Sequence, residues 1–348
     1  MAAATVALSL SAPIMAGAGS ATVWVDDDGR AGASGCASDT PAFSTVQSAV
    51  DATGPDHTVF VCPGVYTEQI VVSGHGHDGL TIESAKRRQA VVRAPAALPE
   101  GRESIALIEG ADRVRLHELK LLASAQTGCD QQLVAILVTS GSQGADIGAN
   151  LIRPEMSNTA VAGCFWFGVM VTGNSSARLV GNTITDFLLG GVFVGGAGSG
   201  ATVSRNVLRY RHVGERLQGC RGDAISVIFS AARVRRNIVS GLPGASLDGT
   251  RPPMLCTRIL VVGTEPGQMV ARDNLVRYAF DGIRLGPDDP ADFELVDGAL
   301  VIENDARHGL GLDCVDTSTG DGTAGTANTW TDNLGLTDAP DGLCTPGS

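Results

Sequence analysis

Four ionisable residues stand beside short segments of alternating polarity in the second half of the sequence. Asp223 and Asp281 each directly precede such a segment. Arg284 lies inside the segment that follows Asp281, and His308 precedes a third segment. Paired carboxyl groups can act as general acid and general base, whereas an arginine with a histidine can hold an anion beside a proton acceptor. The chemistry of these residues therefore depends on how the segments are placed in space.

Two catalytic schemes fit these residues, which are the predicted catalytic set. If the segments stack as neighbouring strands with one between them, the carboxyl groups of Asp223 and Asp281 lie roughly 9–10 Å apart. That separation suits an inverting glycosidase, whose acid and base stand about 6.5–9.5 Å apart. Alternatively, Arg284 neutralises a sugar carboxylate while His308 removes the adjacent proton, as uronate β-elimination requires. Aspartate before Gly or Ala is also a common turn former, so a structural role stays open.

Seven segments of alternating polarity would supply the strands that position these residues. Period-two alternation places every second side chain on one face, so their aliphatic members form a buried face. No helical period of comparable length interrupts the segments, which excludes a doubly wound α/β fold. The segments are 135–138, 168–171, 191–194, 224–227, 258–261, 282–285 and 309–312.

An asparagine recurs in a fixed context: aliphatic, two residues, Asn, one residue, aliphatic. From His117, which fits the Asn position of the first copy, to Asn333 the mean interval is 216/7, or about 31 residues. A constant motif at an irregular period predicts stacked coils with loops of variable length. Stacking would join the amides in a hydrogen-bonded ladder, so their role is structural. The asparagines are Asn150, Asn182, Asn206, Asn237, Asn274, Asn304 and Asn333.

These repeats resemble those of the right-handed parallel β-helix proteins, the pectin-lyase-like superfamily of secreted polysaccharide lyases, hydrolases, esterases and epimerases. The resemblance covers roughly residues 24–336. It implies an all-β, single-stranded right-handed parallel β-helix of about ten coils. It also implies that the asparagines lie between the second and third sheets, and that long loops follow the third strand and flank the first sheet. The excursions at that loop position are 126–132, 154–164, 210–222 and 241–256.

The N-terminal end carries two further signs of this fold. Phe43, Val46 and Val50 share one helical face, which predicts an N-terminal capping helix for the open end of the solenoid. The G-x-Y-x-E motif at residues 64–68 is similar to the opening of pectin methylesterases, and we interpret it as first-coil architecture. The later catalytic signatures of those esterases, and the aspartate signatures of polygalacturonases, have no counterpart in the sequence.

The resemblance implies a cleft over the first sheet, so the outward column of that sheet is the predicted binding surface. Met170 and Phe193 in its apolar half, together with Arg221 beside Asp223, are the predicted substrate-binding residues. An apolar row of this length marks a surface covered by loops, a subunit interface or a sugar-stacking floor. The absence of Trp and Tyr from the column weakens the last of these. The column comprises Leu137, Met170, Phe193, Ser226, Leu260, Arg284 and Gly311.

Eight cysteines in spread positions predict disulfides formed in an oxidising compartment, because no C-x-x-C pair indicates a zinc or thioredoxin-like site. We expect sequential pairing, in which each disulfide brackets one loop or turn of the repeat. Residues 1–21 are small and apolar with A-x-A-like spacings, as in the remnant of a secretory signal peptide, so a secreted or cell-surface protein is expected. The expected pairs are Cys36–Cys62, Cys129–Cys164, Cys220–Cys256 and Cys314–Cys344.

Composition argues against several partners and cofactors. The 348 residues are 43% hydrophobic, which excludes wholesale disorder. The 25 basic and 37 acidic residues give a net charge of −12, which argues against nucleic acid and anionic membranes. Beyond the N-terminus, no segment is apolar and long enough to span a bilayer. Asp313 and Asp316 offer oxygen ligands but lack EF-hand spacing, so we predict no metal site or cofactor and leave Ca²⁺ dependence open.

These observations predict one β-helix domain over residues 22–348, with a cap to about residue 60, coils to about residue 336 and a C-terminal tail at 337–348. The predicted function is binding of an extracellular polysaccharide across the first sheet, with uronate β-elimination or glycoside hydrolysis as its catalytic form. The alternative is a non-catalytic cell-surface or structural β-helix that forms a homo-oligomer through Leu137, Met170 and Phe193.

Overall fold

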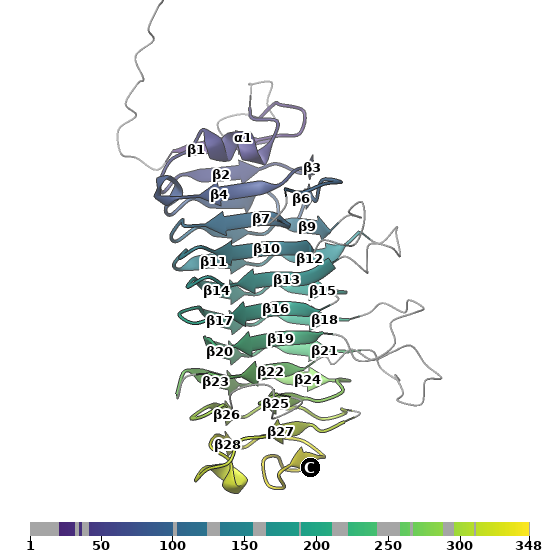
Figure 1. Cartoon of the computed structure of the whole chain (residues 1–348). Helices are drawn as coiled ribbons and strands as arrows, with labels where there is room; N and C mark the ends of the chain where they lie inside the picture. Colours follow the sequence, from purple (N-terminus) through teal and green to yellow (C-terminus); the bar gives the residue numbers. More distant parts are fainter. Residues whose placement is uncertain are drawn as a thin grey trace, which may run out of the picture.

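The computed structural model shows a right-handed parallel β-helix whose strands stack as rungs along one axis (Figure 1). Three parallel sheets form its faces, and successive coils contribute strands to them in the repeating order first, second, third. The predicted all-β solenoid is confirmed. The structure describes residues 21–31, 35–36, 42–99, 103–123, 133–155, 165–187, 189–210, 222–241, 258–264, 267–287, 296–309 and 311–347.

Within those ranges the sheets hold ten, eleven and eight strands. The first sheet comprises β4 (Ile70–Ser73), β7 (Ser104–Glu109), β10 (Leu133–Thr139), β13 (Phe165–Val171), β16 (Gly190–Gly195), β19 (Asp223–Ile228), β22 (Ile259–Val262), β25 (Ile283–Leu285), β27 (Cys314–Asp316) and β29 (Asp338–Ala339). The second comprises β1 (Thr22–Val25), β2 (Thr58–Val61), β5 (Thr81–Ser84), β8 (Arg115–His117), β11 (Ala145–Gly148), β14 (Ser176–Val180), β17 (Gly200–Ser204), β20 (Ala231–Arg235), β23 (Met269–Arg272), β26 (Leu300–Ile302) and β28 (Thr329–Thr331). The third comprises β3 (Gly64–Thr67), β6 (Ala90–Arg93), β9 (Lys120–Ala123), β12 (Leu151–Pro154), β15 (Thr183–Thr185), β18 (Val207–Arg209), β21 (Ile238–Ser240) and β24 (Leu275–Arg277).

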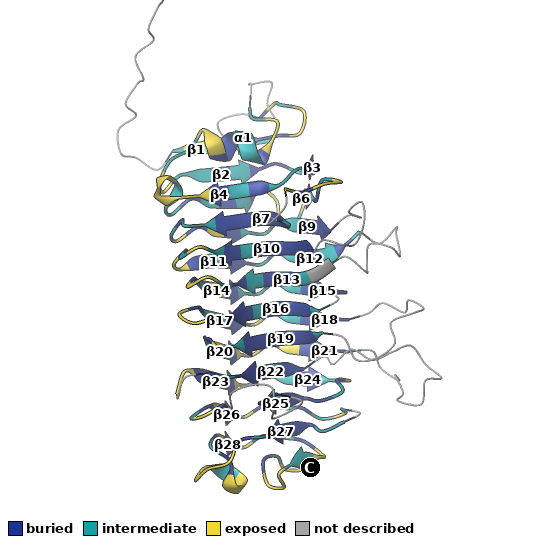
Figure 2. Cartoon of the chain, in the orientation of Figure 1, coloured by how far each residue is buried: buried dark blue, intermediate teal, exposed yellow. Residues whose placement is uncertain are grey.

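The inward residues of the first sheet form one buried column because the register is the same from coil to coil. Val169 pairs with Val192, which pairs with Ile225. Burial of each such side chain stabilises the fold by roughly 1.5–3 kcal/mol. Figure 2 shows this buried interior running through the stack. Ten side chains predicted from the alternation have no exposed surface, namely Val169, Val171, Val192, Val194, Ile225, Val227, Ile259, Val261, Ile283 and Leu285.

The prediction of a strand at 309–312 is wrong. The first-sheet strand of this coil is β27, whose Cys314 pairs with Ile283. Gly309, Gly311 and Leu312, the described residues of the expected strand, belong to no strand, and the Gly311 N–H donates to the carbonyl of Phe280 at 2.6 Å. A Cβ on Gly311 would lie 2.8 Å from an Asp281 carboxylate oxygen, so the glycine is needed for this close approach and not for a strand.

The asparagine ladder is confirmed at the corner between the second and third sheets. Each amide nitrogen donates to the amide oxygen of the next asparagine at 2.9–3.1 Å, from Asn150 to Asn333. Each oxygen also accepts a backbone N–H from the coil before it. The placement of His117 in this column is wrong, because Leu119 stands there and donates its N–H to Asn150 at 2.9 Å.

A short helix, α1 (Val46–Asp51), lies at the N-terminal end of the solenoid (Figure 1). It buries Val46 and Val50 as predicted, whereas Phe43 precedes the helix and pairs with Val25. The two carboxylate oxygens of Glu68 accept the N–H groups of the first two helical residues, both at 2.8 Å. Burial raises the pKa of Glu68, although these hydrogen bonds oppose the rise. Glu68, the last residue of the G-x-Y-x-E motif, thus joins the first coil to the helix.

Two of the four expected disulfides, Cys36–Cys62 and Cys314–Cys344, are confirmed. The other four cysteines and residues 1–20 lie outside the described residues. The segment 337–348, set apart as a tail, contributes β29 to the first sheet, where it pairs with β27. Two 3₁₀ turns, η1 (His75–His77) and η3 (Thr323–Gly325), complete the described helices, none of which is long and apolar enough to cross a membrane.

Replacing Asn206 with Ala should destabilise the fold by about 3–5 kcal/mol, because it removes four buried hydrogen bonds. The carbonyl of Leu179 and the amides of Asn182 and Asn237 would lose a partner. Urea unfolding followed by circular dichroism measures the change. Arg209→Ala, an exposed residue of the same coil, is the control and should leave the midpoint unchanged. Equal midpoints for the two variants would contradict a stabilising ladder.

Candidate functional site

The loops expected to flank the first sheet occur at the predicted place in the chain. Each of the four excursions joins a third-sheet strand to the next first-sheet strand, as between β18 and β19 and between β21 and β22. Much of each excursion lies outside the described residues. The variable segments therefore begin and end at the corner between the third and first sheets, at one edge of the outer face of the first sheet.

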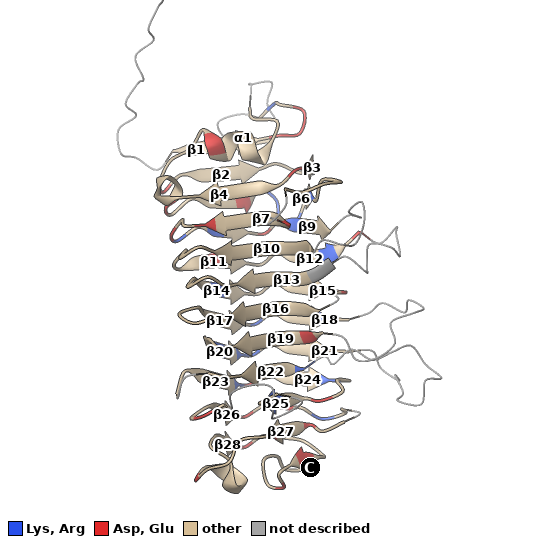
Figure 3. Cartoon of the chain, in the orientation of Figure 1, with Lys and Arg blue, Asp and Glu red and all other residues tan. Residues whose placement is uncertain are grey.

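The outward column of that sheet is continuous, and its side chains are half-buried except for the buried Ser226 and Val315. Register places Met170 beside Phe193, and the rings of Phe193 and Phe167 pack at 5.5 Å. Strands β10, β13 and β16 hold no charged residue (Figure 3). Arg221 lies outside the described residues. The observed column replaces Gly311 with Val315 and comprises Leu137, Met170, Phe193, Ser226, Leu260, Arg284 and Val315.

Beyond the uncharged strands β10, β13 and β16, the first sheet carries a largely buried charged network that we name the ion-pair chain: Asp223, Arg258, Asp281 and Arg284. The Nε atom of Arg258 lies 2.6 Å from a carboxylate oxygen of Asp223. Its terminal nitrogen lies 3.2 Å from Asp281, and Arg284 contacts the same oxygen of Asp281 at 3.2 Å. Asp223, Arg258 and Asp281 are 9%, 5% and 4% exposed. The ion-pair chain thus contains three of the four residues predicted to be catalytic, namely Asp223, Asp281 and Arg284.

Arg258 occupies the space between the two carboxyl groups. An inverting glycosidase needs a water molecule there, together with one protonated acid. A guanidinium at that place instead pairs with both carboxylates. Burying charge is costly unless every group is paired, so this chain is a constrained unit. Two hydrogen bonds fix the orientation of the Arg284 side chain. It donates to the Asp281 carboxylate at 3.2 Å and to the carbonyl of Pro287 at 2.8 Å.

The sequence patterns did not identify Arg258 as part of the site, because it was counted as the first residue of an alternating segment. A signal was nevertheless present. The residues in register with it on the neighbouring coils are Ala224 and Gly282. A long cation at a position that is otherwise Gly or Ala cannot serve as ordinary packing. Comparing the repeats position by position would have singled it out.

His308 does not stand in register with Asp281, so that part of the prediction is wrong. The residue level with Asp281 is Leu312, whose N–H donates to the Asp281 carboxylate at 3.2 Å. The exposed His308 ring lies beside Tyr278, with ring centroids 6.3 Å apart. The catalytic roles of His308, Asp223, Asp281 and Arg284 remain predictions.

A second charge cluster lies close to His308 in the chain. Arg277 and Arg307 both contact the carboxylate of Asp305, with Arg307 at 2.8 Å. Burial alone would raise the pKa of Asp305, but hydrogen bonds from the two arginines outweigh it and hold that pKa well below its usual range. The carboxylate is therefore a paired structural anion.

Within the described ranges, one group of side chains could hold a metal ion: His75, Asp78 and Asp112, whose ligand atoms lie within 4.8 Å of one another. Asp78 and Asp112 each already accept a backbone N–H of the following turn at 2.8 Å, so the group is explained as turn capping. The carboxylates of Asp313 and Asp316 accept protein donors, including two backbone N–H groups and an indole N–H. These contacts account for the aspartates in structural terms.

No family model and no curated protein matches the sequence. A pectin methylesterase from carrot is similar in structure, with a TM-score of 0.51 and 13% identity over 93% of this chain and 90% of that one. An alginate lyase from a Paenibacillus species has a TM-score of 0.50 and 14% identity over 87% of this chain and 95% of that one. The shared feature is the fold, and the protein is a right-handed parallel β-helix of the same kind as these two.

Replacing Arg258 with Met should destabilise the fold by about 3–5 kcal/mol, because two buried carboxylates then lose the cation that lies between them. The urea midpoint of unfolding measures the loss. Arg272→Met is the control, since it removes a half-exposed partner of Glu303 and should shift the midpoint far less. Similar shifts in the two variants would show that the ion-pair chain is no more constrained than a surface pair.

Asp305→Asn should lower stability at pH 7 but not at low pH. The folded-state pKa of Asp305 lies below its ordinary value of 3.8, so the ionised form stabilises the fold above that pH. The contribution is lost as pH falls through the folded value. Urea midpoints of wild type and variant should therefore begin to converge as the pH falls below about 4, and they should meet as it falls through the lower, folded-state pKa. Exposed Asp321→Asn is the control, and a constant Asp305 difference at all pH values would be the contrary result.

Proposed function

We propose that the protein is a secreted β-helix that binds and cleaves an extracellular polysaccharide across the outer face of its first sheet. The observation that carries the proposal is the ion-pair chain, a buried network of alternating carboxylates and guanidinium groups next to the half-buried side chains of Met170 and Phe193. Buried charges held by specific partners are common at functional sites. The two confirmed disulfides support an oxidising extracellular compartment.

The geometry favours uronate β-elimination over hydrolysis. Arg258 fills the space that a hydrolytic water would need between Asp223 and Asp281. An elimination instead requires a cation at the uronate carboxylate and a base for the C5 proton. Arg284 is the proposed cation and His308 the proposed base. The C5–H bond breaks, a C4–C5 double bond forms, and the glycosidic oxygen leaves C4 and takes up a proton.

Fold-level analogy points to the same class of substrate. The two structural neighbours are a pectin methylesterase and an alginate lyase, so their names give pectin and alginate as the polymers on which they act. The fold hosts several reactions, so the residues of the first sheet must decide the reaction here. Their arrangement offers a cation beside an apolar row, which suits a sugar with one carboxylate and one apolar face.

Replacing Arg284 with Met should lower activity on a uronate polymer by about 100-fold, because the developing charge on the carboxylate loses its cation. The assay follows the ultraviolet absorbance of the unsaturated uronate and, in parallel, new reducing ends, on polygalacturonate, alginate and neutral dextran. Arg284→Lys should recover part of the activity, and exposed Arg209→Met should retain all of it. Circular dichroism establishes that each variant is folded.

Reducing ends without the unsaturated product would replace elimination with hydrolysis. No product from any polymer, together with an oligomer in light scattering that Phe193→Asp dissociates, would favour the non-catalytic alternative. In that case the half-buried row, and not the ion-pair chain, would be the functional part of the first sheet.

A further inference from the structure

We propose that the second sheet carries a separate binding surface for an acidic polysaccharide, outside the first-sheet site. The surface spans four adjacent strands, β14, β17, β20 and β23. Together these strands hold four arginines and no acidic residue. We name this set the arginine face; it comprises Arg178, Arg233, Arg235 and Arg272. The inference rests on the proposed function in one respect only, that the ligand class is a polysaccharide.

The charge of the arginine face opposes that of the whole protein. The chain has a net charge of −12, so its average field repels an acidic polymer. The outer arginines of the face are compensated by acids from neighbouring strands: Arg178 by Asp146 at 3.0 Å and Arg272 by Glu303 at 2.6 Å. The two central arginines, both exposed, form no ion pair within the part of the chain that the structure describes. Their charge is available to a ligand.

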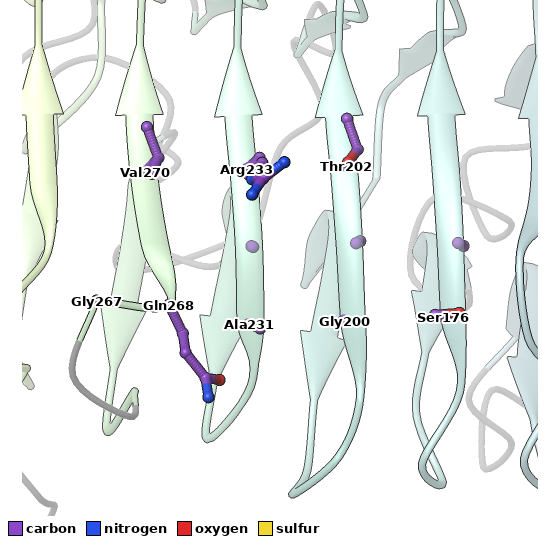
Figure 4. Close-up of a pocket in the computed structure, with 11 residues that line it drawn as sticks. Ser176, Gly200, Thr202, Ala231, Arg233, Gly267, Gln268 and Val270 are labelled. Carbon is purple, nitrogen blue, oxygen red and sulfur yellow. The ribbon is translucent and has the colours of Figure 1, made fainter.

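A groove of about 440 Å³ crosses these strands. Figure 4 shows Gly200 and Ala231 in its floor, with Thr202 and Arg233 from the next outward row along one side. The groove is open at this row because the outward residues there, Gly200 and Ala231, have little or no side chain. Gln268, exposed at the β23 end, adds an amide that can bind hydroxyl groups.

The shape of the groove selects an extended ligand. Because it crosses four strands about 4.8 Å apart, it runs along the solenoid axis for about 14 Å. Arg178 and Arg233 stand two strands apart in one row, which places their origins about 10 Å apart along that axis. Of these two, Arg233 forms no ion pair with the described residues, and the half-exposed Arg178 would share its charge between Asp146 and the ligand. Guanidinium groups bind carboxylate and sulfate through paired hydrogen bonds. A linear glycan with repeated carboxylate or sulfate groups satisfies this spacing, whereas a compact anion would contact the arginines of one strand only.

Isothermal titration with oligogalacturonate and alginate oligomers tests the inference, with neutral dextran oligomers as the uncharged probe. The double variant Arg233→Ser/Arg235→Ser should bind the acidic oligomers about tenfold more weakly or worse. The matched control, Arg87→Ser/Arg209→Ser, removes two exposed arginines elsewhere and should bind within about twofold of wild type. Ala231→Trp keeps every charge but fills the floor, and should also weaken binding. Added salt should weaken wild-type binding, because the contacts are charged and exposed.

Several results would overturn the inference. Equal losses in both double variants would indicate net charge alone, and unchanged binding by Ala231→Trp would indicate that the groove is not used. Equal affinity for single-stranded DNA would replace a glycan surface with a general polyanion surface. The proposed function can fail independently of this inference. If Arg284→Met retains full activity while Arg233→Ser/Arg235→Ser loses binding, the proposed first-sheet site is contradicted and the arginine face is supported. If Arg284→Met loses activity while Arg233→Ser/Arg235→Ser binds as wild type does, only the arginine face is contradicted.

Discussion

The in-register stacking of the coils, held at one corner by the column of buried amides from Asn150 to Asn333, is the constraint on which every other feature depends. Each amide joins two coils through both its side-chain oxygen and its nitrogen, so neighbouring coils cannot slide by one residue without leaving buried polar groups unpaired. A residue on an outer face therefore has a fixed neighbour one strand above and one below. The outward side chains of each sheet therefore form columns along the solenoid axis, and any surface site is built from residues of successive coils.

This periodicity explains why the fold was predictable from the sequence and the site only in part. The alternating segments and the recurring asparagine report local geometry, which every coil repeats, so a short motif such as that around Asn206 was sufficient to predict the stack. The proposed site consists of departures from the repeat, and a search for the repeat does not reveal them. Arg258 was absorbed into a segment because its neighbours alternate correctly. The turn at Gly311 was mistaken for a strand because glycine fits either pattern, and His308 was misplaced in consequence.

Two outer faces handle charge in opposite ways. On the first sheet, Asp223, Arg258, Asp281 and Arg284 neutralise one another in near-complete burial, where an uncompensated charge would cost several kcal/mol. Such a network fixes the direction of a side chain and adds little attraction at a distance. On the second sheet, the exposed Arg233 and its neighbours lie in water, where each pair is weak but a group of like charges attracts an acidic polymer. The first arrangement suits chemistry at one bond, and the second suits retention of a chain.

The shared register gives these two surfaces a common direction. Both run along the solenoid axis, since both are columns across parallel strands, yet they lie on different faces, so one straight segment of polymer cannot occupy both. The second sheet would therefore bind one segment of the polysaccharide while the first sheet acts on another. The two segments would belong to the same polymer chain or to two neighbouring chains. Linking two weak contacts in this way raises the effective concentration of the second without any new contact at the first. If both proposed surfaces bind, a solenoid with binding columns on two faces suits an insoluble or entangled polymer, where diffusion away from the substrate limits the rate.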